Sequence, residues 1–331
     1  MWKKIIHLVE RIHHKKIPAG EFSYGMDYLT NETINSAHEY LLKYSQTVLE
    51  SSDKFFAFTP PRFTFDGKLL SFPAPIIYPH QAAVNKISYA KVFLSVNSQK
   101  AVIVIPHWCA AEKSYLDLCL ALSKLGFTAV RMTLPYHEER GEEGWEFNND
   151  MVSANIGRTI QSVRQSVIEV RAVARWLKQT GHKRIGIVGG SIGSCVASIA
   201  QAHDQNINSL FANHMSSYFG DVVWLGVSTK HIRKSLEKNI SQPDAHDYWE
   251  IISPMSYIKR VANTKPNHFI MIGKHDLTFP YHLSRQVMAE YKKYNVEAEF
   301  KTMPVGHFTL RYPPYSYYIF GLIVNHFRKT L

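Results

Sequence analysis

Residues 183–200 read KRIGIVGGSIGSCVASIA, and this stretch decides the fold. An apolar run leads into Gly189-x-Ser191-x-Gly193, and small, helix-compatible residues follow. This is the sequence form of a strand, a tight turn and a helix. A serine on such a turn has a strained backbone and an exposed hydroxyl, and its flanking glycines are needed because side chains there would collide with neighbouring elements. Ser191 is therefore a candidate nucleophile, and an ordinary glycine-rich turn is the alternative.

Length and composition indicate a globular protein. The chain has 331 residues, of which 45% are hydrophobic and 20% are charged, and it is long enough for one large α/β domain. Its three cysteines, Cys109, Cys119 and Cys195, are too few for a disulfide framework and suit a reducing compartment. Glu10 and Arg11 interrupt the apolar start, which makes it a poor secretory signal. We expect a cytoplasmic protein.

The net charge of +11 is partly concentrated at the start of the chain. The first sixteen residues hold Lys3, Lys4, Arg11, Lys15 and Lys16 against a single acidic residue. Apolar residues recur at helical spacing there, so we expect an amphipathic helix that packs on the body of the domain. Weak contact of residues 1–16 with an anionic membrane surface is the alternative. The sequence contains no nucleic-acid-binding motif, and we expect no nucleic-acid partner.

Strand and helix patterns alternate along most of the chain. The AVIVI run at 101–105 is typical of a strand covered on both faces. Repeated strand–helix units predict an α/β fold with a mostly parallel, eight-stranded sheet flanked by helices. Residues 1–84 read as an N-terminal helical extension with the first strand or strands, including a helix over 31–50 capped by Asn31. Residues 85–331 read as the catalytic domain.

Two later strand ends carry the partners that a serine nucleophile needs. A weak hydroxyl nucleophile requires a base, and that base requires an orienting acceptor. Asp276 follows the predicted strand 268–272, and His307 follows the predicted strand 296–303. The carboxyl ends of parallel strands are where active-site groups gather in such sheets. We therefore expect Ser191, His307 and Asp276 to form a catalytic triad, with helix capping as the alternative role of Asp276.

The oxyanion of an acyl-transfer intermediate also needs fixed hydrogen-bond donors. The backbone N–H of Ile192, directly after the serine, is one expected donor. The loop after the strand 101–105 should supply the other, from either Trp108 or Cys109.

These residues together resemble the α/β-hydrolase superfamily over about residues 85–331. The resemblance rests on Gly189–Gly193, on Gly273-x-x-Asp276, on Gly306-His307 and on Ser253-Pro254. The stretch Leu134-Pro-Tyr-His137 is similar to a loop of the dienelactone-hydrolase and acyl-peptidase-like branch, and the chain resembles its α/β-hydrolase domain-containing type 18 proteins. The resemblance implies hydrolysis of an ester, thioester or amide through an acyl-enzyme, without a cofactor.

The sequence departs from the common pattern at three places. His107-Trp108 stands where a His-Gly pair is usual, which leaves the second oxyanion donor open. Segments 136–157 and 216–260 are long, and they form either a cap over the serine or solvated surface insertions. The first of them contains His137-Glu138-Glu139, which we do not expect to bind a metal because no second cluster of ligands accompanies it.

The expected activity is that of a carboxylesterase-like serine hydrolase acting on a small-molecule or lipid-like acyl ester. An acyltransferase on the same scaffold is one alternative, because sequence does not report whether water is excluded from the acyl-enzyme. A non-catalytic binding protein with a hydrolase fold is the other, and Trp108 in the oxyanion loop is the residue that favours it.

Overall fold

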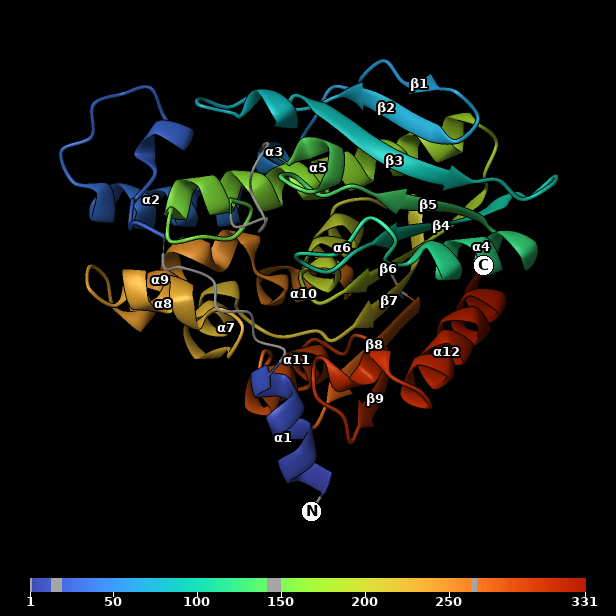
Figure 1. Ribbon diagram of the computed structural model, residues 1–331. Helices are drawn as coiled ribbons and strands as arrows, with labels where there is room; N and C mark the ends of the chain where they lie inside the picture. The colour runs from blue at the N-terminus through green and yellow to red at the C-terminus, as the bar shows by residue number, and fades with distance from the viewer. Residues whose placement is uncertain (1, 13–19, 142–149, 263–266) are drawn as a thin grey trace.

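One mixed sheet organises the computed structural model, which describes residues 2–12, 20–141, 150–262 and 267–331 (Figure 1). Its nine strands run in the order β1-β2-β3-β5-β4-β6-β7-β8-β9. They are β1 (Thr64–Phe65), β2 (Leu69–Pro73), β3 (Ile87–Phe93), β4 (Lys100–Ile105), β5 (Thr128–Met132), β6 (Arg184–Gly190), β7 (Ile207–Asn213), β8 (Asn267–Gly273) and β9 (Glu299–Met303).

The sheet is mostly parallel, as the sequence predicts. The pairs from β5 through β9 are parallel, whereas β1, β2 and β3 add antiparallel strands at one edge. The described residues form nine strands, one more than the expected eight, and the additional strand is β2, which pairs with β3 near the edge of the sheet. Its sequence LLSFP ends in a proline and does not alternate between apolar and polar residues, so it gives a weak strand signal.

Helices cover both faces of the sheet. The α-helices are α1 (Trp2–Ile12), α2 (Ala37–Glu50), α3 (Ser52–Phe55), α4 (Leu116–Lys124), α5 (Ile156–Gln179), α6 (Ile192–Ala202), α7 (Phe219–Leu225), α8 (Lys230–Leu236), α9 (Gln242–Trp249), α10 (Ile258–Val261), α11 (Tyr281–Lys293) and α12 (Tyr315–Thr330). Helices α5, α6 and α11 contribute to the larger apolar core on one face, and α4 and α12 contribute to the smaller core on the other. None of the helices in the described ranges is long and apolar enough to cross a membrane.

Local sequence explains these elements. Residues 101–105 of β4 are all buried, as expected for a strand with helices on both faces. Asn155 caps the long helix α5 by accepting from the backbone N–H of Arg158 at 2.9 Å. Helix α2 begins later than its expected start, because Ser36 rather than Asn31 is its N-cap. The Ser36 hydroxyl accepts from the backbone N–H of Glu39, which satisfies one of the free donors of the first turn.

Two of the sequence predictions fall partly on residues outside the described ranges. Lys15 and Lys16 of the basic start lie there, and so do residues 142–149 of the acidic segment that begins at His137. The second long segment, 216–260, lies within the described ranges and folds into α7, α8, α9, α10 and intervening short 3₁₀ turns.

Candidate active site

The turn between β6 and α6 places Ser191 at the carboxyl end of a central strand. Ser191 has φ 56° and ψ −121°, a region that side chains rarely adopt. A Cβ at Gly189 would collide with the carbonyl oxygen of Gly193, and one at Gly193 would lie 2.6 Å from the carbonyl oxygen of Pro106. The glycines at both positions are thus required by close backbone approach, and the strained serine turn is the one that the sequence predicts.

The three residues expected to act together are neighbours in space. Ser191 Oγ lies 2.9 Å from Nε2 of His307, and His307 Nδ1 lies 2.8 Å from Oδ2 of Asp276. Asp276 follows β8, and His307 follows β9. Each residue therefore lies just beyond the carboxyl end of its own parallel strand, which is why residues separated by up to 116 positions meet.

Asp276 is a buried carboxylate with donors on both oxygens. Its Oδ1 accepts from the backbone N–H groups of Thr278 and Phe279 at 2.8 and 2.7 Å, and its Oδ2 faces His307. Burial alone raises the pKa of Asp276, but the charge of His307 and hydrogen bonding to the carboxylate outweigh burial and hold the pKa well below its usual range. Asp276 is therefore ionised at neutral pH.

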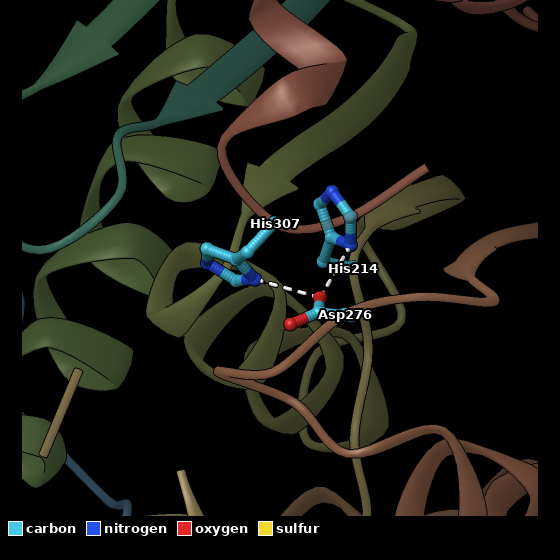
Figure 2. A group of neighbouring side chains, drawn as sticks. All are labelled: His214, Asp276 and His307. Atoms are coloured by element: carbon cyan, nitrogen blue, oxygen red, sulfur yellow. Dashed lines mark hydrogen bonds and ion pairs between the residues drawn. The ribbon is translucent and has the colours of Figure 1, made fainter. Parts of the chain in front are cut away.

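A second histidine, His214, faces the same carboxylate oxygen (Figure 2). Its Nδ1 lies 2.9 Å from Oδ2 of Asp276, although the angle is poor for a hydrogen bond, and its ring centroid is 4.7 Å from that of His307. Burial lowers the pKa of His214 more than Asp276 raises it, so His214 is neutral. Sequence reasoning missed this residue, yet a signal existed, since His214 directly follows β7.

Two acidic side chains raise the pKa of His307. Burial lowers its pKa, but Asp276 and then Glu10 raise it, and the net pKa lies above the usual value for histidine. Glu10 comes from α1, is fully buried, and accepts from the backbone N–H of Phe308 at 2.8 Å. Burial and the charge of Asp276 in turn raise the pKa of Glu10. The N-terminal helix thus contacts the loop that carries His307, a connection that the sequence did not predict.

The two candidates for the second oxyanion donor differ in their surroundings. The backbone N–H of Cys109 donates to Nε2 of His137 at 3.0 Å, and Nδ1 of His137 donates to the carbonyl oxygen of Pro135 at 2.8 Å. The Cys109 N–H therefore already donates a hydrogen bond to a side chain of a neighbouring loop. The indole ring of Trp108 stacks at 6.0 Å on the ring of His231, and Trp108 lines the cavity beside Ser191.

The side chains considered for metal binding have protein partners. Both ring nitrogens of His137 form hydrogen bonds within the protein. The carboxylate of Glu138 forms an ion pair with the buried Arg131 at 2.7 Å. Within the described residues, His214, Asp276 and His307 are close enough to share an ion, with ligand atoms within 4.8 Å of one another. Asp276 and His307 are already hydrogen-bonded in series with Ser191 Oγ, which is the arrangement of a proton relay.

An apolar cavity of about 70 Å³ opens beside Ser191. Its walls come from the loop after β4, from α6, from the segment around α7 and from the loop after β8, and include Trp108, Cys195, Phe219, Val222, Val223 and Phe279. The hydroxyls of Ser228 and Thr278, which also line it, bond each other at 2.7 Å. The cavity therefore presents mainly apolar surface to a group attached to the reacting carbon.

Comparison with known proteins identifies a family and a fold. The model of the prolyl oligopeptidase family matches residues 140–331. No curated protein matches the chain significantly. The structure of acetyl xylan esterase 1 from Thermoanaerobacterium sp. JW/SL YS485 is 13% identical with a TM-score of 0.58, covering 93% of this chain and 99% of that one.

Two further solved structures share the architecture. An esterase from Pyrococcus furiosus is 15% identical with a TM-score of 0.54, covering 96% of this chain and 99% of that one. The acylaminoacyl peptidase from Pyrococcus horikoshii is 14% identical with a TM-score of 0.58, covering 84% of this chain and 42% of that one. This chain therefore spans less than half the length of the peptidase. At such identities the likeness establishes the α/β-hydrolase fold.

Proposed function

This chain belongs to the prolyl oligopeptidase family of α/β serine hydrolases, and we propose that it cleaves a carboxylic ester or thioester through an acyl-enzyme. One observation carries the proposal. Ser191 Oγ, His307 and Asp276 lie in series, with contacts of 2.9 and 2.8 Å, and Ser191 lines an apolar cavity. Both distances are within the reach that proton transfer requires.

In the proposed reaction, Ser191 Oγ attacks the acyl carbon while Nε2 of His307 takes the hydroxyl proton. Asp276 keeps the imidazole in the tautomer with its proton on Nδ1 and stabilises the imidazolium. The tetrahedral intermediate collapses when His307 gives the proton to the leaving oxygen or sulfur, which departs as an alcohol or thiol. Water then attacks the acyl-enzyme by the same steps and releases the carboxylic acid.

We assign the oxyanion donors to the backbone N–H groups of Ile192 and Trp108. Ile192 is the first residue of α6, directly after the nucleophile, where an N–H has no carbonyl partner within its own helix. Trp108 is preferred over Cys109 because the Cys109 N–H is committed to His137. Fixed donors of this kind are worth about 10²–10³ in kcat each.

The cavity supports an ester rather than a peptide as substrate. Its volume of about 70 Å³ and its mainly apolar lining suit a short acyl chain, whereas a peptide needs partners for its own N–H and C=O groups. We propose that segment 216–260 acts as a cap, because Phe219, Val222 and Val223 of α7 supply part of the cavity wall. We further propose that the remainder of residues 85–331 forms the catalytic domain and that residues 1–84 form its extension.

The finer placement within the superfamily is also a proposal. The loop Leu134-Pro-Tyr-His137 supports the dienelactone-hydrolase and acyl-peptidase-like branch and its type 18 proteins. In this structure, His137 of that loop fixes Cys109 on the oxyanion loop, which gives the motif a physical role beside the nucleophile.

Labelling with a fluorophosphonate probe tests the proposal, because the probe reacts only with an activated serine. We expect wild type to be labelled, and we expect Ser191→Ala and His307→Ala to remain unlabelled. Hydrolysis of p-nitrophenyl esters of increasing chain length, measured beside a chromogenic dipeptide amide, then separates esterase from peptidase action. Folded wild type that is neither labelled nor active on any ester would contradict the proposal, and faster cleavage of the dipeptide would contradict the substrate class.

A further inference from the structure

Helix α1 has an apolar face that the described part of the chain leaves largely exposed. Ile6 and Glu10 are its buried residues, and they face the loop that carries His307. On the other side, four large apolar side chains are exposed: Trp2 by 51%, Ile5 by 44%, Leu8 by 57% and Ile12 by 68%. Packing on an apolar partner is what ordinarily stabilises so short a helix, yet these four side chains remain largely exposed in the described structure.

The charges around this face are positive. Lys3, Lys4 and Arg11 of α1 are exposed, whereas its one acidic residue, Glu10, is buried. Lys3 and Lys274 both act to lower the pKa of His275, after burial and His7, so positive groups also gather where α1 meets the loop after β8. An apolar face with cationic residues beside it and a tryptophan at one end is typical of a helix that lies in the surface of an anionic bilayer.

Neighbouring residues continue the same surface. Helix α1 contacts the short turn η6 (Thr309–Arg311), where Arg311 is exposed. The guanidinium of Arg311 donates to the hydroxyl of Tyr312 at 3.0 Å, and Tyr312 is itself exposed. Tyrosine and arginine are residues that favour the headgroup region of a bilayer. Figure 1 shows α1 at the rim of the molecule, with the N-terminus at its outer end.

We propose that α1 is a lipid-docking helix, which inserts its exposed apolar face into the surface of an anionic bilayer and holds the entrance of the active site beside that surface. The commitment to lipid rests on the combination of apolar and cationic groups, since a second copy of this chain would bring Lys3, Lys4 and Arg11 against their own equivalents. The buried contacts of Ile6 and Glu10 fix the helix to the His307 loop, so the docked helix sets the distance between the bilayer and Ser191.

The consequence for substrate supply rests on the proposed hydrolase function. An acyl ester dissolved in the bilayer surface would reach Ser191 without crossing bulk water, which suits an apolar cavity that faces the reacting carbon. The docking itself does not depend on catalysis, and the two ideas can be tested separately.

Cosedimentation of the full chain with vesicles tests the docking. Vesicles of phosphatidylcholine alone are compared with vesicles of equal parts phosphatidylcholine and phosphatidylserine. We expect binding that increases with phosphatidylserine and falls by about tenfold or more in Leu8→Asp, because that variant loses the burial of one leucine and gains a negative charge. Lys4→Ala should weaken binding to the anionic vesicles by about fivefold.

Two controls make the test specific. Leu94→Asp changes a leucine that is 56% exposed and directly follows β3, a strand that lies far from α1 in Figure 1, and the variant should bind vesicles as wild type does. Ser191→Ala should also bind as wild type does, so a failed hydrolase assay with intact binding would refute only the proposed function. Near-ultraviolet circular dichroism checks that Leu8→Asp is folded.

Two outcomes would overturn the proposal. The first is wild-type binding to the anionic vesicles that Leu8→Asp leaves unchanged. The second is absence of wild-type binding to either vesicle. If wild type also self-associates and Leu8→Asp abolishes that self-association, the face is assigned to contact between copies of the chain.

Discussion

Replacing Asp276 with asparagine tests the proposed relay sharply, because the structure dictates which way the new amide must face. In wild type, Oδ1 accepts from the backbone N–H groups of Thr278 and Phe279 at 2.8 and 2.7 Å. An amide nitrogen cannot accept a hydrogen bond. In Asp276→Asn the amide oxygen therefore keeps the position of Oδ1, and the amide nitrogen takes the position of Oδ2.

That nitrogen then faces two imidazoles. In wild type, Nδ1 of His307 lies 2.8 Å from Oδ2 and Nδ1 of His214 lies 2.9 Å from it. Because an amide N–H donates, each Nδ1 must become an acceptor, and His307 must carry its proton on Nε2. That Nε2 can no longer accept the proton of Ser191. Loss of the correct tautomer in a Ser-His-Asp arrangement costs about 10⁴-fold in kcat, or about 5.5 kcal/mol of activation free energy.

The assay is kcat/KM on a soluble short-chain p-nitrophenyl ester, together with the rate of fluorophosphonate labelling. Both should fall by about 10⁴-fold in Asp276→Asn. Asp117→Asn, an exposed position on α4, is the matched control and should retain wild-type rates. A folded Asp276→Asn that keeps activity within about tenfold of wild type would refute the tautomer argument and the assignment of Asp276.

Three further predictions follow from the site and its surroundings. Because the pKa of His307 is raised, kcat/KM should increase with pH through a midpoint above the usual histidine value. Glu10→Gln should move that midpoint to lower pH, because it removes a charge that stabilises the imidazolium. A pH–rate profile that does not move in this variant would contradict the coupling between Glu10 and His307. Gly193→Ala should lower the free energy of unfolding by about 1–3 kcal/mol or more in chemical denaturation, because its Cβ would lie 2.6 Å from the Pro106 carbonyl oxygen, whereas Gly321→Ala, in an open part of α12, should raise it by about 0.5–1 kcal/mol. Val222→Ala should shift the preferred acyl chain of p-nitrophenyl esters to greater length by enlarging the cavity, with each additional buried methylene worth about 0.8 kcal/mol; an unchanged chain-length profile would mean that the acyl group binds elsewhere.

Residues that follow strands were predictable from the sequence. Ser191 directly follows β6, and Asp276 and His307 lie in the loops after β8 and β9; parallel strands bring such ends together whatever their separation along the chain. His214 has the same kind of position after β7, but 17 histidines in the sequence make any one of them a weak signal. Its role depends on facing Asp276, which is a three-dimensional property.

Long-range contacts of the N-terminal helix could not be predicted in the same way. Glu10 and Phe308 are 298 residues apart, and no periodicity links a helix at the start of the chain to a loop near its end. The sequence shows an amphipathic helix but does not determine which of its residues are buried. In the structure the buried residues of α1 are Ile6 and Glu10, so an acidic side chain faces inward while most of the apolar face of the helix is exposed.

The burial of Glu10, on a helix whose apolar residues are mostly exposed, places a carboxylate beside His307. Two carboxylates, Asp276 and Glu10, lie close enough to His307 to raise its pKa, and each raises the free energy of ionising the other. The ionised forms of both carboxylates are stabilised when His307 is an imidazolium, which is the state that forms as Ser191 is deprotonated. Docking of α1 therefore adds negative potential where positive charge develops, and any movement of α1 on a bilayer would alter the basicity of His307 as well as the position of the site.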